Sequence, residues 1–321
     1  MRKILTLLLF AILLLPTPVL AGTPITIPNQ GILGGYMIDL TGVSNNSTTE
    51  FVEGDMTDVQ VVEVYTATWC ENCVYSEHAL MDALENESAT VLVHHRSIGE
   101  SQDPFGTEAG DLRWMDLYGE TSAEAASGLE RAAPSVVFDG HRFVAGSAPH
   151  GDSLESDYTE MFAEKHHFRN DMQNYCCSSN FTWTGDNASG TLEWMAVLPV
   201  PLTIGWQTRL MIVEHSAHFP DGSNGMEYYE DVVRMVVDVQ DTRYPSPHGI
   251  DDGYETFSGS VEIQLPAAWD GDDLSLVLVH EWEDATIWPE PNPNEGPASL
   301  PGFLAPLGLI ALGAAALTRR E

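Results

Sequence analysis

Lysine is almost absent from this chain of 321 residues, where it occurs only at Lys3 and Lys165. Lysine and arginine together number 13, against 48 aspartates and glutamates, so the formal net charge is −35 at pH 7. A surface of this sign repels nucleic acid and anionic lipid, and no nucleic-acid partner is expected. The composition suits a saline setting, where salt screens the mutual repulsion of acidic groups.

Cysteine is also scarce, with four in the chain: Cys70, Cys73, Cys176 and Cys177. A zinc site at Cys70 and Cys73 would need a second Cys or His pair at ligand spacing, and the other two cysteines are adjacent. The Asp- and Gly-rich turns contain no twelve-residue calcium loop of the EF-hand type. We therefore expect no metal and no cofactor.

Cys70 and Cys73 lie between a predicted strand and a predicted helix. Residues 61–65 are mostly apolar and β-branched, which predicts a buried strand, and residues 74–84 place apolar side chains at roughly helical spacing. The free N–H groups and the dipole of a helix start stabilise a thiolate. Cys70 is predicted to be the exposed catalytic nucleophile and Cys73 the resolving thiol. A structural disulfide and half of a metal site are the alternatives.

This order of strand, Cys-x-x-Cys motif and helix resembles the thioredoxin superfamily. Residues 133–146 resemble that family's cis-proline loop and the two-stranded hairpin after it. The resemblance implies that Ala133 and Pro134 face the dithiol and hold the extended backbone of a client peptide. It also implies that Trp69 shapes the rim of this substrate-binding site.

The motif departs from the family pattern in two ways. The family's buried acid would fall six residues before the first cysteine, where this chain has Val64. Glu63 is next to it, but strand alternation points Glu63 to the opposite face. Glu71 and Asn72 replace the usual Gly-Pro, and a carboxylate beside Cys70 raises the pKa of its thiol. These departures favour slower exchange than that of a thioredoxin.

The predicted thioredoxin-like domain spans residues 55–175. Two helical stretches, 107–118 and 122–132, form an insertion before the proline loop, and residues 152–175 supply the closing helix. His94 and His95 end a predicted strand. Adjacent side chains of a strand point to opposite faces, so this pair is not expected to chelate a metal.

Cys176 and Cys177 follow that domain directly. A disulfide between neighbours is strained and easily reduced. The two residues are a possible second redox pair that exchanges with Cys70 and Cys73. A local disulfide at the domain junction is the other interpretation.

The sequence pattern changes from helical to strand-like after residue 178, and residues 179–288 predict an all-β sandwich domain. Strand-like segments alternate with Asp- and Gly-rich turns, at 190–198, 207–214, 231–239, 257–265 and 274–281. An α/β thioredoxin-like domain followed by a β-sandwich resembles an exported two-domain family first described as bacterial outer-membrane lipoproteins. This resemblance covers roughly residues 55–288.

Both ends of the chain resemble sorting signals. Residues 1–21 combine a basic start, a short apolar run and a small-residue end, typical of a secretory signal peptide; a lead segment, 22–54, follows. Residues 301–321 begin Pro-Gly-Phe and end in an arginine pair after a short apolar run, which resembles the archaeal PGF-type sorting signal. A Pro-rich spacer, 289–300, precedes it. An ordinary C-terminal membrane helix is the alternative.

These signals predict an extracytoplasmic protein that the C-terminal segment anchors to the cell membrane. Five N-x-S/T sequons make it a candidate glycoprotein: Asn45, Asn46, Asn86, Asn180 and Asn187. The expected partners are exported proteins that contain cysteine.

The sequence thus favours a surface-anchored thiol–disulfide oxidoreductase. One alternative is a binding or adhesion protein on a thioredoxin scaffold, in which the Cys70–Cys73 disulfide is structural. Another is a metal-delivery module that uses both cysteines and a histidine such as His78.

Overall fold

The computed structural model describes six parts of the chain: residues 23–43, 47–85, 87–163, 177–199, 204–240 and 254–284. The predicted signal peptide, the Pro-rich spacer and the C-terminal sorting segment lie outside these parts. Among the described residues, no helix is both long and apolar enough to cross a membrane.

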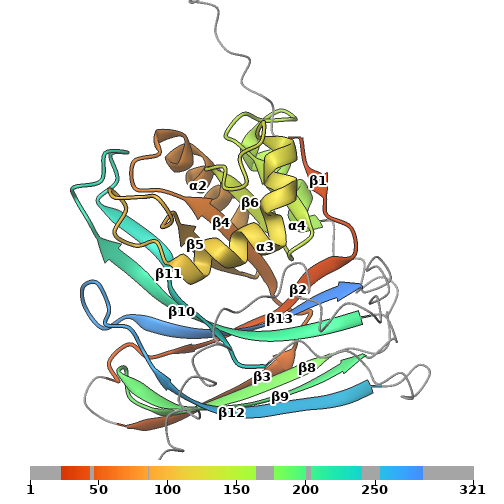
Figure 1. The fold of residues 1–321 in the computed structure, drawn as a ribbon, viewed down its shortest axis with the longest axis vertical. Coiled ribbons are helices and arrows are strands. Elements are labelled where there is room, and N and C mark those ends of the chain that lie inside the picture. Colours follow the sequence, from red (N-terminus) through yellow and green to blue (C-terminus); the bar gives the residue numbers. More distant parts are fainter. Residues whose placement is uncertain are drawn as a thin grey trace, which may run out of the picture.

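The protein is a mixed α/β structure built on a nine-stranded mixed sheet and a four-stranded antiparallel sheet (Figure 1). The larger sheet has the order β1-β7-β6-β4-β5-β11-β10-β13-β2. Its first five strands carry the helices, and its last four face the smaller sheet, β12-β9-β8-β3.

The helix-bearing half contains the predicted order of strand, Cys-x-x-Cys and helix. Strands β4 and β5 are parallel, whereas β6 is antiparallel to both β4 and β7. Helices α2 and α4 pack on one face of these strands and α3 packs on the other. The bounds are β1 Ile25–Thr26, β4 Gln60–Thr66, α2 Glu71–Leu84, β5 Ala89–His95, α3 Glu108–Ala125, β6 Ser135–Phe138, β7 Arg142–Ala145 and α4 Leu154–Ala163.

The second half is two sheets with an apolar core between them. Its centre holds three large buried side chains, Trp183, Trp206 and Phe181. All five predicted strand segments form strands, and three further strands join them. The bounds are β2 Gln30–Asp39, β3 Thr48–Asp55, β8 Ser178–Gly185, β9 Ser189–Pro199, β10 Ile204–His218, β11 Tyr228–Asp238, β12 Tyr254–Gln264 and β13 Leu274–Asp284.

The two halves share one sheet, which the sequence did not predict. Strand β11 runs parallel to β5, with Val232 opposite Val93. An apolar cluster lies where the halves meet, with Val61 and Leu92 on one side and Met211 and Val277 on the other. The hydrogen bonds of one continuous sheet therefore join the helix-bearing half to the β-rich half.

The segment 22–54 differs from the expected lead segment, because it supplies three strands. Strand β1 pairs with β7, β2 pairs with β13, and β3 pairs with β8. The glycines of β2 made it hard to predict as a strand, because glycine is uncommon in strands. At Gly35, where φ is +83°, an added Cβ would lie 2.9 Å from a methyl of Val61, so a side chain there would separate β2 from β4.

The helical insertion also differs from the expectation. One helix, α3, replaces the two predicted stretches, and residues 126–132 form a turn. Ser127 and Gly128 have φ values of +55° and +93°, which are incompatible with a right-handed helix.

A buried charge network connects the two halves. Glu63 of β4 pairs with Arg113 of α3, which also donates from Nε to Glu281 of β13 at 2.8 Å. Arg209 of β10 pairs with Glu281 in turn. Burial alone would raise the pKa of Glu63, but Arg113 and a hydrogen bond with His94 hold it well below its usual range. Glu63 thus faces α3, opposite to α2, as strand alternation predicted.

His280 makes the β-rich core sensitive to acid. Its ring is fully buried on β13, with Nε2 2.8 Å from Ser179 Oγ and Nδ1 3.0 Å from Thr208 Oγ1. Burial lowers the pKa of His280 from 6.5 to about 3. As pH falls below 6.5, the unfolded chain therefore binds a proton before the folded chain does.

We expect this histidine to remove up to about 1.4 kcal/mol of stability per pH unit between pH 6.5 and 3. Urea unfolding of the wild type and His280→Gln, measured from pH 7.5 to 4, isolates the contribution. The variant should show the shallower dependence on pH. Identical slopes would contradict a neutral buried His280.

Candidate active site

Helix α2 begins at the Cys-x-x-Cys motif. Cys70 is the N-cap of α2, and its Sγ accepts a hydrogen bond from the Cys73 N–H at 3.2 Å. Cys70 and Cys73 form a disulfide, with their Cα atoms 5.3 Å apart. A sulfur at this place receives the N–H groups and the positive end of the helix dipole, which stabilise a thiolate once the disulfide is reduced.

Cys70 is less exposed than the sequence predicted. It is 6% exposed and Cys73 is 0% exposed. Ala67, Trp69 and Ala133 pack around the two sulfurs. Cys70 is still the more accessible of the two cysteines.

The proline loop lies beside the disulfide. The Ala133–Pro134 peptide bond is cis, and Ala133 belongs to the same apolar cluster as both cysteines. The Pro134 carbonyl accepts a hydrogen bond from the Gly146 N–H at 2.8 Å, just beyond β7. The structure therefore brings Trp69 and Ala133 together with the two cysteines, and Pro134 follows Ala133 in the chain.

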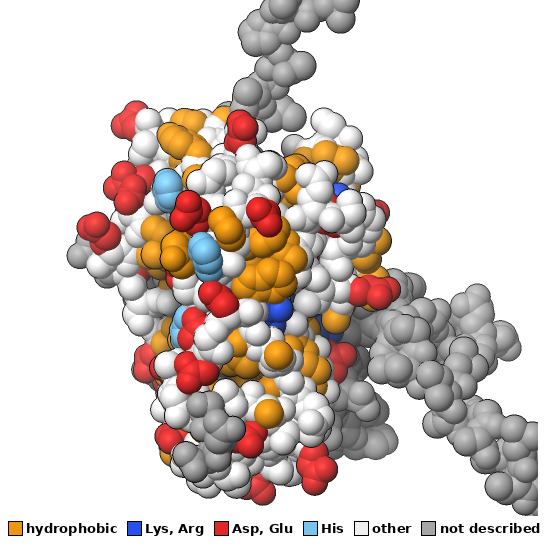
Figure 2. Space-filling model, turned by 90° about the vertical axis from the view of Figure 1, so that its left-hand side faces the viewer, with side chains coloured by type: hydrophobic (Ala, Val, Ile, Leu, Met, Phe, Trp, Pro, Cys, Tyr) orange, Lys and Arg blue, Asp and Glu red, His pale blue; other side chains and the backbone are white. Residues whose placement is uncertain are grey.

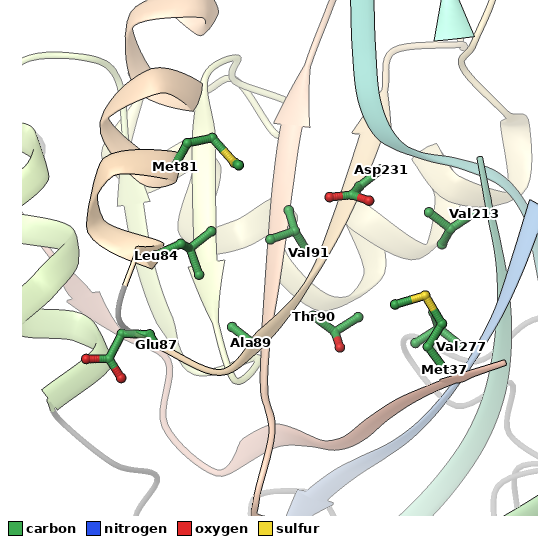
Figure 3. A pocket seen from close by; sticks show the side chains of 10 residues that line it. All are labelled: Met37, Met81, Leu84, Glu87, Ala89, Thr90, Val91, Val213, Asp231 and Val277. Carbon is green, nitrogen blue, oxygen red and sulfur yellow. The ribbon is translucent and has the colours of Figure 1, made fainter. Parts of the chain in front are cut away.

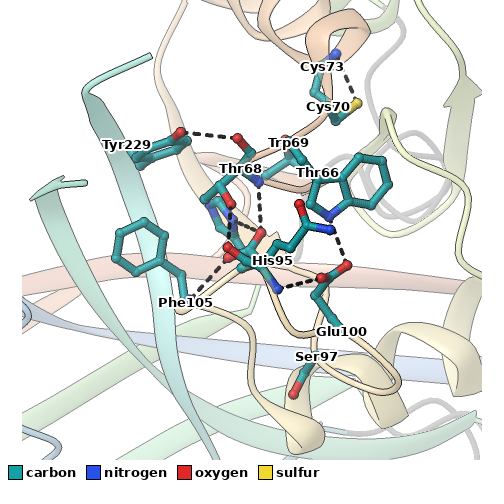
Figure 4. A network of polar contacts seen from close by, with 12 residues as sticks. Thr66, Thr68, Trp69, Cys70, Cys73, His95, Ser97, Glu100, Phe105 and Tyr229 are labelled. Carbon is teal, nitrogen blue, oxygen red and sulfur yellow. Dashed lines mark hydrogen bonds and ion pairs between the residues drawn. A yellow bond between two sulfur atoms is a disulfide. The ribbon is translucent and has the colours of Figure 1, made fainter. Parts of the chain in front are cut away.

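Trp69 is fixed at the rim of the site by polar partners (Figure 4). Its Nε1–H donates to Glu100 Oε2 at 2.8 Å, and the guanidinium of Arg96 lies 5.7 Å from the centre of the indole ring. Burial would raise the pKa of Glu100, but N–H groups of Ser101 and Gln102 lower it overall. The loop after β5 thus holds the indole through a carboxylate.

The residue before Trp69 connects the site to the β-rich half. The Thr68 N–H donates to Asp103 Oδ2 at 2.8 Å, while the Thr68 carbonyl accepts from the Asn224 N–H at 3.1 Å. The Tyr229 hydroxyl also points at this carbonyl (Figure 4). Asn224 lies in the loop between β10 and β11. No pattern in the sequence predicts these contacts, because they depend on how the two halves meet.

His94 and His95 point to opposite faces of the sheet, as predicted. His94 Nε2 lies 3.0 Å from Glu63 on the α3 side, whereas His95 Nδ1 lies 2.8 Å from Asp103 near the Cys-x-x-Cys loop. Within the described ranges, no group of three or more His, Cys, Asp or Glu side chains is arranged to hold a metal ion.

The structure describes only one residue of the predicted second redox pair. Cys177 is buried in the core between the two sheets, with Met56 and Phe181, and it belongs to a different cluster from the disulfide. Cys176 lies outside the described residues.

A cavity of about 250 Å³ lies away from the disulfide (Figure 3). It opens between the end of α2, the start of β5 and the strands of the β-rich half, and it contains none of the predicted site residues. Most of its lining is apolar: Met37, Met81, Leu84, Glu87, Ala89, Thr90, Val91, Val213, Asp231 and Val277.

The face shown in Figure 2 carries many carboxylates and few basic groups, with apolar side chains gathered near its middle. Tyr228 and Trp269 are among the exposed apolar residues of the protein. An acidic surface of this kind favours partners that are neutral or basic where they touch it.

No protein-family model and no curated protein matches this chain. Among solved structures, it is similar to protein AGR_C_4864 from Agrobacterium tumefaciens, with 15% identity and a TM-score of 0.40 over 68% of this chain and 93% of that one. It is also similar to HBP35 of Porphyromonas gingivalis, with 12% identity and a TM-score of 0.42 over 78% and 83% of the two chains. By its own strand order and site geometry, the chain carries a Cys-x-x-Cys disulfide in a fold that resembles thioredoxin-like proteins.

Proposed function

We propose that this protein is a surface-anchored thiol–disulfide oxidoreductase that acts on exported proteins. The observation that carries the proposal is the Cys70–Cys73 disulfide at the start of α2, beside the cis Ala133–Pro134 bond. The N-cap position stabilises the sulfur of Cys70 as an anion, which is the form that attacks and leaves in disulfide exchange.

The chemistry needs no group beyond the two cysteines and the client. A client thiolate attacks Cys70 Sγ; a bond forms between client sulfur and Cys70, and the bond to Cys73 breaks with its electron pair on Cys73. A second client thiolate then attacks the client sulfur and releases Cys70 as a thiolate. The client is oxidised by two electrons and the Cys70–Cys73 pair is reduced by two. The reverse sequence reduces a client disulfide.

The two halves of the protein have separate parts in this proposal. Trp69, Ala133 and Pro134 hold the client chain beside Cys70, since Trp69 and Ala133 pack against the disulfide and Pro134 follows Ala133 through the cis bond. The β-rich half positions the site through Asn224 at the Thr68 carbonyl. The C-terminal segment of the sequence anchors the protein outside the cell, where exported clients fold.

Trapping a client on Cys70 tests the proposal. In the full-length Cys73→Ser variant the resolving sulfur is missing, so Cys70 should accumulate as a mixed disulfide with an unfolded test protein that has one accessible disulfide. The variant in which both cysteines are serine is the matched control and should trap nothing. If the Cys73→Ser protein forms no adduct, the proposal is contradicted and the disulfide is a structural one.

A further inference from the structure

Opening the disulfide places charge on a sulfur that water does not reach. Cys73 is 0% exposed, and burial disfavours a thiolate. In the first step above, the electron pair of the broken bond stays on Cys73. A neighbouring group that supplies a proton would therefore speed the step, and the same group would remove the proton when Cys73 attacks.

Glu77 is the acidic side chain placed to do this. It follows Cys73 by four residues on α2, so both side chains lie on one face of the helix. Glu77 is partly exposed, and its carboxylate reaches the sheet, where Thr66 Oγ1 donates to Glu77 Oε1 at 2.6 Å. Thr66 ends β4, immediately before the loop that carries the cysteines.

The surroundings of Glu77 favour the protonated acid. Burial raises the pKa of Glu77, although the Thr66 hydrogen bond and the charge of His95 act against this rise. A carboxyl group with a raised pKa keeps its proton to a higher pH than an ordinary glutamate, so it is better suited to give a proton and take it back.

His95 is a second buried polar group near Glu77. Its Nδ1 is bonded to Asp103, and its Nε2 has no hydrogen-bond partner among the residues that the structure describes. The ring is almost fully buried and acts electrostatically on Glu77. An unpartnered buried nitrogen costs stability, so its presence beside the Cys-x-x-Cys loop favours a functional reason for keeping it there.

We propose that Glu77 gives a proton to Cys73 when the disulfide opens and takes it back when Cys73 attacks a mixed disulfide. The inference rests on the proposed function. In the opening step the Glu77 O–H bond breaks, a Cys73 S–H bond forms and the negative charge moves to the Glu77 carboxylate. His95 favours this charge electrostatically, whereas Asp103, which holds the His95 ring, acts against it. The other titratable groups that interact with Glu77 are His78 on its own helix, Tyr158 of α4 and Tyr229 of β11.

The direct test is the pH dependence of mixed-disulfide resolution. The full-length protein is loaded at Cys70 with a small aromatic thiol, and release of that thiol by Cys73 is timed from pH 4 to 9. For the wild type, the rate should rise through an inflection at the pKa of Glu77. Glu77→Gln should lose this inflection, matching the wild type on its acidic side and resolving about 10²-fold more slowly just above it.

Two further variants separate proton transfer from simple packing. Thr66→Val keeps Glu77 but removes the hydrogen bond that lowers its pKa, so the inflection should move to higher pH. This variant also decides the matter if Glu77→Gln does not fold. Asp82→Asn changes an exposed acid on the same helix and should leave the profile unchanged.

The possible failures are distinguishable. If Glu77→Gln has the same pH profile as the wild type, or if Thr66→Val does not move the inflection, the role of Glu77 is overturned. The proposed function is then unaffected. A wild-type protein in which Cys73 never displaces the thiol from Cys70 would overturn both.

Discussion

Cys70→Ser should reduce the exchange rate to that of the uncatalysed reaction, because the sulfur that meets the client is then gone. Removing Cys176 and Cys177 together should leave most of the activity. Cys177 is buried in the core between the sheets, apart from the cluster around the disulfide. The measurement is the rate at which the full-length protein restores the disulfide of a reduced test protein.

The variant that removes Cys176 and Cys177 is built as Cys176→Ser with Cys177→Ala. Serine at position 177 would place a hydroxyl group in buried surroundings, where it is costly without a hydrogen-bond partner. Thiol trapping of the untouched pair and a thermal unfolding curve show that each variant is folded. Equal loss of activity in the two variants would contradict a site confined to Cys70 and Cys73. It would favour a relay through Cys176 and Cys177.

Arg113→Met should lower the free energy of unfolding by about 3–5 kcal/mol, because it leaves two buried carboxylates without their shared cation. Those carboxylates belong to Glu63 and Glu281, one in each half of the protein. The Tyr118 hydroxyl also donates to Glu63. Urea unfolding at pH 7 gives the value, and its midpoint is compared with that of the wild type.

Two companion variants identify the cause of that loss. Asp238→Asn breaks the exposed end of the same network, where Arg209 Nε meets Asp238 at 2.6 Å, and should cost less than about 1 kcal/mol. Adding Glu63→Gln to Arg113→Met should recover part of the stability, because it removes the buried charge that Arg113 had compensated, whereas Glu281 keeps Arg209 as its partner. A loss below 1 kcal/mol for Arg113→Met would contradict the buried network.

The sequence predicted the local features of the site well because they depend on neighbouring residues. Apolar β-branched residues before Cys70 formed β4, and the helix began directly after Cys70. The cis bond at Pro134 and the hairpin of β6 and β7 were also found where the residues indicated them. Alternation along β4 and β5 correctly separated Glu63 from the disulfide and His94 from His95.

The sequence could not predict contacts between distant segments. Gly34 and Gly35 suggested a flexible lead segment, yet they allow β2 to approach β13 and β4 closely. The contact of Asn224 with Thr68 depends on the parallel pairing of β11 with β5. Glu77 carried no motif, because its position against Thr66 follows only from how α2 packs on the sheet.

The reduction potential of the Cys70–Cys73 pair tests the central claim most directly. The full-length protein is equilibrated with a series of glutathione mixtures, and free thiols are trapped and counted, with the Cys176→Ser, Cys177→Ala variant to assign the signal. An exchange-competent pair should give a value of roughly −120 to −270 mV, and the value shows which way the electrons run. A value well below about −300 mV, with no exchange on a test disulfide, would contradict the account and make the disulfide a structural one.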